Sequence, residues 1–280
     1  MAEADPRPGA PHPGAPSPGA APARPARAVP ARARPDQCVE AMGYAVYNED
    51  LSLIPLSRPC STIQTISPIS YGNAIRDPLH RRAMQEADWL CLDGVYFGLA
   101  SLVLKRRTTK PNQGPDIFYH FLARLQETKG RVFFLGASPA TLEKITARMA
   151  CDYPEVAVAS YSPPFKPEFS EDDNEAMIAA INAFRPDVVF LGMTAPKQEK
   201  WAHAHRDRLD AAIVASVGGV FDWYAGNRPE IHPFWWKIYM AWLIRTIDRP
   251  ELLRRYPKIA LFFWHLMLAA VGIRRYPGND

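Results

Sequence analysis

The sequence predicts a protein of the α/β class with a helical C-terminal appendage. Short runs rich in Val, Ile, Phe and Leu alternate with amphipathic stretches from about residue 63 onward. The chain has 280 residues, of which 48% are apolar, and this is enough to bury a sizeable core. The last fifty residues differ in composition, because aromatic and basic side chains are interleaved there.

The order of the predicted elements specifies the type of sheet. We expect strands at residues 63–66, 89–92, 131–135, 156–160, 187–191 and 211–217, and helices at residues 139–149, 171–184 and 196–209. Ser138 before Pro139 is a helix start signal, and Ser170 followed by Asp173 resembles a capping box. Apolar strands that alternate with helices indicate a Rossmann-like, mostly parallel sheet with helices on both faces.

The two ends of the chain set the expected domain limits. Residues 1–35 contain ten prolines, eleven alanines and five arginines, a composition typical of a disordered arm. This arm carries most of the net charge of +4, so the charge does not indicate a nucleic-acid-binding fold. We expect the α/β core at residues 36–230 and the appendage at residues 231–280.

The C-terminal segment has two possible roles. The apolar run 259–273 has fifteen residues and would span only about 22 Å as a helix, too short to cross a bilayer. Mixed aromatic and basic residues suit the surface of an anionic membrane. A helix that packs on the core or on another subunit is the alternative, and a homo-oligomer is possible.

Several common kinds of site are missing from the sequence. It contains no Gly-x-Gly for a dinucleotide, no P-loop, no Gly-x-Ser-x-Gly and no Asp-x-Asp pair for a divalent metal. We therefore expect neither a metal nor another cofactor, and a nicotinamide-dependent oxidoreductase is disfavoured. The four cysteines are widely separated, and no secretory signal pattern is present. We expect a cytoplasmic protein.

Short polar phrases follow five of the predicted strands. They are Thr65-Ile66-Ser67-Pro68, Asp93-Gly94, Gly136-Ala137-Ser138-Pro139, the segment from Gly192 to Glu199, and Gly218-Gly219-Val220-Phe221-Asp222. The carboxyl ends of parallel strands meet at one edge of a sheet, where helix N-termini favour anions. The sequence therefore predicts a site for an anionic ligand, with Asp93 as the best carboxylate for proton transfer.

The order of these phrases adds a family resemblance. The motifs are Thr65, Asp93-Gly94, Gly136 with Pro139, Tyr153-Pro154, Pro186-Asp187, Gly192, Pro196-Lys197-Gln198-Glu199 with Trp201, and Val217-Gly218-Gly219 with Phe221-Asp222 and Gly226. Over residues 63–256 this set resembles the WecG/TagA/CpsF glycosyltransferases (glycosyltransferase family 26). The resemblance implies inverting, metal-independent transfer of a sugar from a UDP-sugar to a polyprenyl-diphosphate-linked saccharide. It also implies work at the cytoplasmic face of the plasma membrane, in the synthesis of cell-surface polysaccharides such as exopolysaccharide or teichoic acid.

The resemblance also implies roles for individual residues. Asp93 matches the proposed base, and Thr65 and Gln198 match positions around the sugar and the diphosphate. The expected substrate-binding residues are Ser67, Gly94, Gly136, Gly192, Lys197, Glu199, Gly218, Gly219, Phe221, Asp222 and Arg245. Without a metal, N–H groups and basic side chains must stabilise the charge that develops on the leaving UDP.

The chain departs from the family pattern at several positions. Ser67 stands where the family usually has Asn, and Pro111 stands where it usually has Arg. Because these changes fall where the donor sugar and the acceptor would be distinguished, the resemblance implies the reaction class but does not specify the family's best-known donor, UDP-N-acetylmannosamine. We expect a divergent exopolysaccharide enzyme. The alternative is a non-catalytic homologue that binds a UDP-sugar or a lipid carrier and organises a polysaccharide assembly complex.

Overall fold

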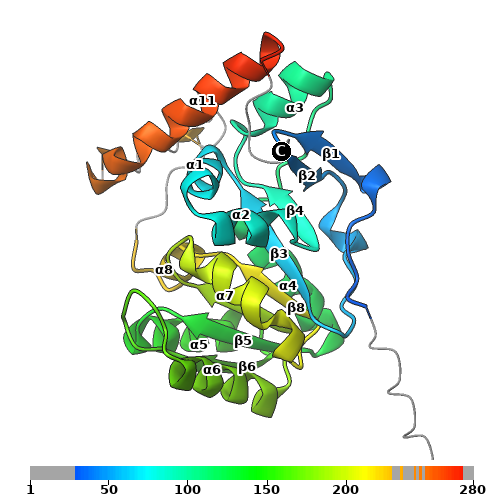
Figure 1. Ribbon diagram of the computed structural model, residues 1–280. Helices are drawn as coiled ribbons and strands as arrows, with labels where there is room; N and C mark the ends of the chain where they lie inside the picture. The colour runs from blue at the N-terminus through cyan, green and yellow to red at the C-terminus, as the bar shows by residue number, and fades with distance from the viewer. Residues whose placement is uncertain (1–28, 229–233, 236–242, 244–245, 248–249, 274–280) are drawn as a thin grey trace, which may run out of the picture.

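The computed structural model describes residues 29–228, 234–235, 243, 246–247 and 250–273. Its centre is a parallel sheet between two layers of helices, with a two-stranded hairpin and the C-terminal helix at one end (Figure 1). The predicted α/β class is therefore confirmed. Residues 1–28 of the predicted arm (residues 1–35) and the gaps after residue 228 lie outside the described residues.

The main sheet has six parallel strands in the order β4-β3-β8-β7-β5-β6. They span β3 (Ser61–Ile66), β4 (Trp89–Leu92), β5 (Arg131–Gly136), β6 (Ala157–Tyr161), β7 (Val188–Gly192) and β8 (Ile213–Ser216). The inner strands β5, β7 and β8 are buried on both faces, which explains their mostly apolar sequences, whereas β3 is buried but carries several polar residues. All six strands coincide with predicted ones, although β8 is shorter than the predicted range.

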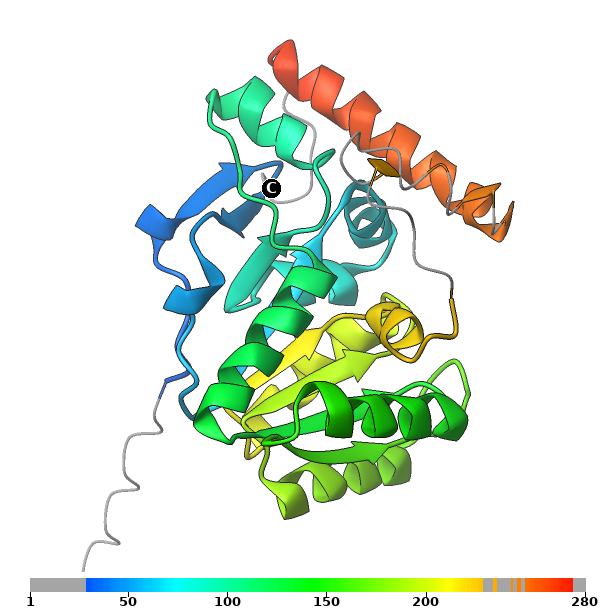
Figure 2. The ribbon, with the colours of Figure 1, turned by 180° about the vertical axis from the view of Figure 1, so that it is seen from behind.

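Helices cover both faces of this sheet. Helices α4 (Gly114–Thr128), α5 (Pro139–Asp152) and α8 (Val220–Tyr224) contribute to the core on one face, which Figure 2 shows in front. Helices α6 (Glu171–Phe184) and α7 (Lys197–His205) pack on the other face. The predicted helix starts are confirmed. Ser138 Oγ accepts a hydrogen bond from the Thr141 N–H at the start of α5, and Ser170 Oγ accepts one from the Asp173 N–H at the start of α6.

The remaining described helices and the hairpin surround β3 and β4. Helices α1 (Pro68–Arg76) and α2 (Pro78–Gln85) follow β3, and α3 (Gly98–Lys105) follows β4. The hairpin β1 (Cys38–Ala41) and β2 (Tyr44–Tyr47) was not predicted. Its sequence signal is Met42-Gly43, where both residues have positive φ (53° and 82°), as a tight hairpin turn requires.

The N-terminal segment is already packed before residue 36. Ala31 and Ala33 contact the main core, and the Ala33 N–H donates to the Asp88 carbonyl over 2.9 Å. These two alanines lie inside the range predicted as a disordered arm. Packing of the described chain against the core therefore begins several residues earlier than the expected boundary.

Helix α11 (Tyr256–Ala270) is the C-terminal helix of the described structure. It packs along α1 and touches α3, with Phe262 and Leu266 buried in this contact. The same helix leaves Phe263, Trp264 and Met267 exposed. One face of α11 is thus part of the core, as the packed-helix alternative expects, and the opposite face is apolar and open. Among the described residues, no helix combines the length and apolarity that crossing a bilayer requires.

Candidate active site

Nearly all of the predicted site residues lie at the carboxyl edge of the sheet. They follow β4, β3, β8, β7 and β5, which are consecutive neighbours in the sheet. The chain leaves β3 toward α1 and leaves β8 toward α8, which lie on opposite faces. Such a reversal opens a crevice beyond the strand ends, where α/β proteins bind their ligands.

Thr65 and Asp93 lie on the two neighbouring strands β3 and β4. Thr65 pairs with Cys91, and the Asp93 N–H continues the ladder by donating to the Ile66 carbonyl over 2.9 Å. Because side chains alternate along a strand, Thr65 and Asp93 leave the sheet on the same face. Both residues are half-buried. The expected base and one of its expected partners therefore lie together at this edge.

The residues that follow Thr65 and Asp93 shape the two turns. Gly94 has φ +73°, a conformation that a side chain would strain. Ser67 caps α1: its Oγ accepts from the Ser70 N–H at 3.4 Å, while Ser70 Oγ accepts from the Ser67 N–H at 2.7 Å. The hydroxyl of Ser67 therefore already has a structural role at the helix start, and substrate contact by this residue stays a prediction.

Pro111 lies beside the turn that carries Asp93. It forms a parallel bridge with Leu92, and the next residue, Asn112, donates its N–H to the Leu92 carbonyl over 3.1 Å. The segment 111–112 thus extends the sheet edge past β4. Pro111 is one of the departures from the family pattern, and the structure places it next to the turn of Asp93.

Gln198 and Glu199 form a buried pair at the start of α7. Gln198 is 6% exposed and Glu199 is 4% exposed. Gln198 Nε2 donates to Glu199 Oε1 over 2.8 Å, and burial raises the pKa of the Glu199 carboxyl. A Cβ at Gly218 would lie 3.5 Å from the Gln198 amide, so this amide reaches the end of β8. Gln198 Oε1 and Glu199 Oε2 have no hydrogen-bond partner among the described residues.

Two further buried polar side chains were missed by the sequence analysis. Gln64 on β3 and Ser216 on β8 have side-chain atoms without a partner in the described part of the chain. The pairing of Ile63 with Ala215 places Gln64 opposite Ser216 on the sheet face that α7 covers. The signal available in the sequence was polarity inside otherwise apolar strands. Unpaired buried polar groups require an explanation such as bound water or ligand.

Two charged residues of the predicted site already have protein partners. Lys197 Nζ donates to the Lys166 carbonyl over 2.7 Å and lies 4.0 Å from the centre of the Phe169 ring. Burial lowers the pKa of Lys197. Asp222 forms an ion pair with Arg228. The Lys166 carbonyl uses one of the three N–H donors of the Lys197 ammonium, so contact between Lys197 and a diphosphate stays a prediction.

Several of the predicted glycines have packing roles. A Cβ at Gly192 would overlap the buried ring of Phe221, and a Cβ at Gly136 would lie 2.7 Å from the Gly192 carbonyl oxygen. Phe221 therefore packs against the strand end. Gly218 has φ +54°, and a Cβ at Gly219 would find no described atom within 4 Å. Gly219 is thus the most open of these positions to a ligand. Arg245 lies outside the described residues.

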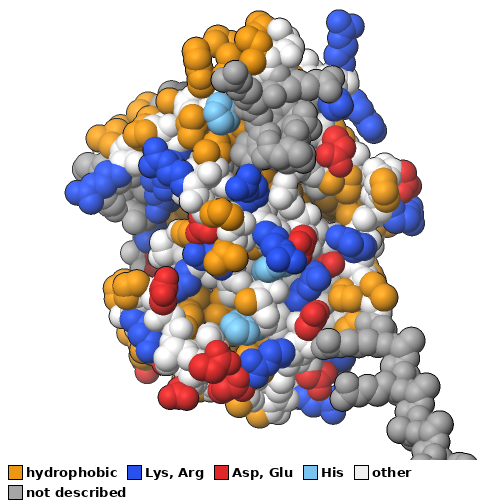
Figure 3. Space-filling view, in the orientation of Figure 1, with side chains coloured by type: hydrophobic (Ala, Val, Ile, Leu, Met, Phe, Trp, Pro, Cys, Tyr) orange, Lys and Arg blue, Asp and Glu red, His pale blue; other side chains and the backbone are white. Residues whose placement is uncertain are grey.

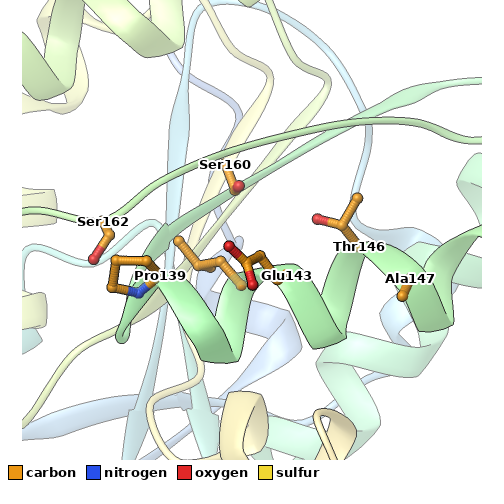
Figure 4. A pocket seen from close by; sticks show the side chains of 7 residues that line it. Pro139, Glu143, Thr146, Ala147, Ser160 and Ser162 are labelled. Carbon is orange, nitrogen blue, oxygen red and sulfur yellow. The ribbon is translucent and has the colours of Figure 1, made fainter.

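A shallow hollow of about 540 Å³ lies beside this edge, between α5 and β6. Figure 4 shows that Pro139, Glu143, Thr146 and Ala147 come from α5 and that Ser160 comes from β6. Ser162 completes the lining, and its Oγ donates to the Ala137 carbonyl over 2.8 Å. Of the predicted strand-end phrases, only Pro139 lines this hollow, so the hollow does not coincide with the candidate site at the strand ends.

Comparison with known proteins supports the same class. The model of the glycosyl transferase WecG/TagA/CpsF family matches residues 45–276. The chain is 27% identical over 193 residues to the N-acetylglucosaminyldiphosphoundecaprenol N-acetyl-beta-D-mannosaminyltransferase of Bacillus spizizenii, covering 69% of this chain and 73% of the relative. The equivalently named proteins of Bacillus subtilis and Staphylococcus aureus are 26% and 23% identical. These matches cover 72% and 76% of this chain, and 78% and 82% of the relatives.

The fold, the strand-end residues and these matches together define a glycosyltransferase. The chain belongs to the WecG/TagA/CpsF family, whose model covers most of its length. The family resemblance seen in the sequence is therefore confirmed. The relatives named above transfer an N-acetylmannosaminyl group to an acceptor linked to undecaprenol through a diphosphate.

Proposed function

We propose that this protein transfers a sugar from a UDP-sugar to a polyprenyl-diphosphate-linked saccharide, with inversion and without a metal, in the synthesis of a cell-surface polysaccharide. The observation that carries the proposal is the placement of Asp93 and Thr65 side by side at the carboxyl edge of the sheet. The lipid-linked acceptors in the relatives' names support the acceptor class. The absence of an Asp-x-Asp pair from the sequence agrees with metal independence.

The proposed chemistry is a single displacement. The Asp93 carboxylate takes the proton of the acceptor hydroxyl while the oxygen of that hydroxyl attacks the anomeric carbon of the donor. The bond from that carbon to UDP breaks on the opposite side, and UDP leaves with the bonding electron pair. Thr65 and the amide of Gln198 orient the donor. Backbone N–H groups at the strand ends stabilise the charge that develops on UDP.

The choice of donor sugar is where this chain differs from the usual family pattern. Pro111 lies next to the end of β4, and Ser67 uses its hydroxyl to cap α1. Neither residue offers what the Arg and Asn of the usual family pattern would offer beside Asp93. We therefore propose an exopolysaccharide pathway, and we leave the donor sugar to be identified by the panel of UDP-sugars below.

The lipid-linked acceptors in the relatives' names support a position at a membrane. We propose a peripheral position on the cytoplasmic face, reached through the C-terminal segment. The exposed apolar face of α11 supports this position, since aromatic side chains next to cations suit the lipid interface.

The test is acceptor-dependent release of UDP by the purified full-length protein. The panel contains UDP-glucose, UDP-glucuronate, UDP-N-acetylglucosamine and UDP-N-acetylmannosamine, each with detergent-extracted lipid-linked acceptors and without them. Release from one donor that requires acceptor supports the proposal and identifies the sugar. UDP binding without release from any donor would instead favour a non-catalytic homologue.

A further inference from the structure

We propose that helix α3 docks onto an anionic lipid bilayer together with α11, so that the membrane contact includes a helix from the catalytic core. This inference rests on the proposed function and specifies the partner of its active-site region. The surface consists of Leu99, Leu102 and Val103 on α3, and of Phe263, Trp264 and Met267 on α11. We call it the two-helix surface.

The apolar residues of α3 face outward. Leu102 is 47% exposed and Val103 is 52% exposed, with Leu99 also exposed. The spacing i, i+3, i+4 places these three side chains on one stripe of the helix, while Ala100 and Ser101 are buried on the other side. In a helix at the surface of a soluble protein, the apolar stripe normally faces the core. Helix α3 has the reverse arrangement, which indicates an apolar partner.

Helix α11 shows the same arrangement. Phe263, Trp264 and Met267, at the spacing i, i+1, i+4, are exposed on one side of the helix, while Phe262 and Leu266 are buried against the core. The ring of Phe262 stacks on Phe97, which directly precedes α3, with ring centres 5.2 Å apart. This contact joins the two helices. Figures 1 and 2 show α3 and α11 side by side at one end of the molecule.

Exposed cations border the two-helix surface. Lys105, Arg106 and Arg107 lie at the C-terminal end of α3, and Arg254 and Arg255 precede α11. Figure 3 shows orange side chains along the upper edge of the molecule with blue side chains close by. An apolar patch with a cationic border complements the acyl chains and anionic headgroups of a bilayer. A second copy of the chain would bring these cations toward their equivalents, so charge complementarity favours lipid.

The position of α3 connects this surface to the active site. Helix α3 begins at Gly98, five residues after Asp93, and both belong to the connection that follows β4. Docking of α3 would therefore hold the loop of the proposed base near the membrane surface. A diphosphate that is anchored in the bilayer by a polyprenyl chain must react at that level.

The experiment measures binding of the full-length protein to sedimented vesicles. One set contains phosphatidylcholine with about 30% phosphatidylglycerol, an anionic lipid that attracts basic side chains. The other set contains phosphatidylcholine alone. The variant Leu102→Glu/Val103→Glu is compared with Leu53→Glu, whose side chain is 55% exposed on a short helix outside the surface. We expect strong binding of the parent to anionic vesicles only. The double variant should lose roughly tenfold or more in affinity, and Leu53→Glu should match the parent.

Two readouts separate this inference from the proposed function. UDP release is measured with an acceptor in vesicles and with a water-soluble, short-chain acceptor. The double variant should lose activity with the first acceptor and keep it with the second. If the parent releases no UDP with either acceptor, the proposed function fails, and the vesicle binding still decides the role of α3.

Other outcomes overturn the inference. Unchanged vesicle binding by the double variant would remove α3 from the membrane contact. Sedimentation that shows a parent oligomer broken by the double variant, with no vesicle binding by either protein, would assign the surface to a second copy. Leu99→Glu provides the same test if thermal unfolding shows that the double variant is destabilised.

Discussion

The side-chain amide of Gln198 donates a hydrogen bond from Nε2 to Oε1 of the neighbouring Glu199, over 2.8 Å. Both side chains are buried, and the oxygen of the Gln198 amide, Oε1, has no partner among the described residues. The bond to Glu199 therefore uses one N–H of the amide, fixes which end is nitrogen, and leaves the carbonyl oxygen available. We propose that Glu199 positions Gln198 through this bond, while substrate contact by Glu199 Oε2, which has no partner among the described residues, stays a prediction.

Substitution of Glu199 tests this role. Glu199→Gln keeps an oxygen that accepts from Gln198, so we expect transfer activity within about threefold of the parent. Glu199→Leu removes the acceptor, and because a hydrogen bond contributes about 1 kcal/mol, we expect a loss of roughly three- to tenfold in kcat. Steady-state kinetics of UDP release measures both. Equal activity of the parent and the Leu variant would show that Glu199 does not orient Gln198.

Gly192 and Phe221 provide a test of packing at the strand end. A Cβ at Gly192 would overlap the Phe221 ring, so Gly192→Ala should destabilise the fold by about 1–3 kcal/mol. Gly219→Ala is the matched control, because Gly219 has φ −65° and open space around it. Urea unfolding compares the two variants. The packing interpretation is wrong if both variants are as stable as the parent.

His80 makes stability depend on pH. It is fully buried in α2, and burial lowers its pKa from 6.5 to about 4. The unfolded chain therefore binds a proton more readily below pH 6.5. Above pH 6.5, His80 is neutral in both states and its protonation does not reduce the free energy of unfolding. As the pH falls from 6.5 toward 4, the unfolded chain binds the proton and the free energy of unfolding decreases. At pH 5 this loss amounts to roughly 2 kcal/mol.

The variant His80→Leu isolates this contribution. We expect the free energy of unfolding of the parent to decrease more between pH 7.5 and pH 5 than that of the variant, by roughly 2 kcal/mol. Urea titrations at the two pH values provide the measurement. Parallel changes in the two proteins would mean that another group causes the acid sensitivity.

Two N-terminal deletions test where the folded part begins. Removing residues 1–28 should leave the melting temperature and activity unchanged. Removing residues 1–35 also deletes Ala31 and Ala33, which pack on the core, and the hydrogen bond from Ala33 to Asp88. Each lost kcal/mol should lower the melting temperature by about 2–4 °C. Identical melting of the two deletion variants would contradict a structural role for residues 29–35.

The sequence predicted the central sheet well because its signals there are local. Apolar strands, and helix starts such as those capped by Ser138 and Ser170, can be recognised without information from distant residues. The hairpin β1–β2 was missed because each strand has only four residues. Strand order was also not predictable, since it depends on contacts between distant segments such as β3 with β8.

The site was predicted at the level of strand ends rather than of individual contacts. Asp93 and Thr65 lie together because consecutive strands pair. The interaction of Lys197 with the Lys166 carbonyl depends on the path of a loop, which no local motif specifies. The contact of Phe221 with Gly192 depends likewise on how α8 packs against β7.

The most direct test of the account is acceptor-dependent UDP release by Asp93→Asn beside the parent, with the donor identified by the panel. Asparagine keeps the size of the side chain but cannot accept the hydroxyl proton. We expect kcat to fall by about a hundredfold or more, with the KM for the donor and the melting temperature unchanged. Comparable release by the two proteins would contradict the assignment of Asp93 as the base and, with it, the proposed mechanism.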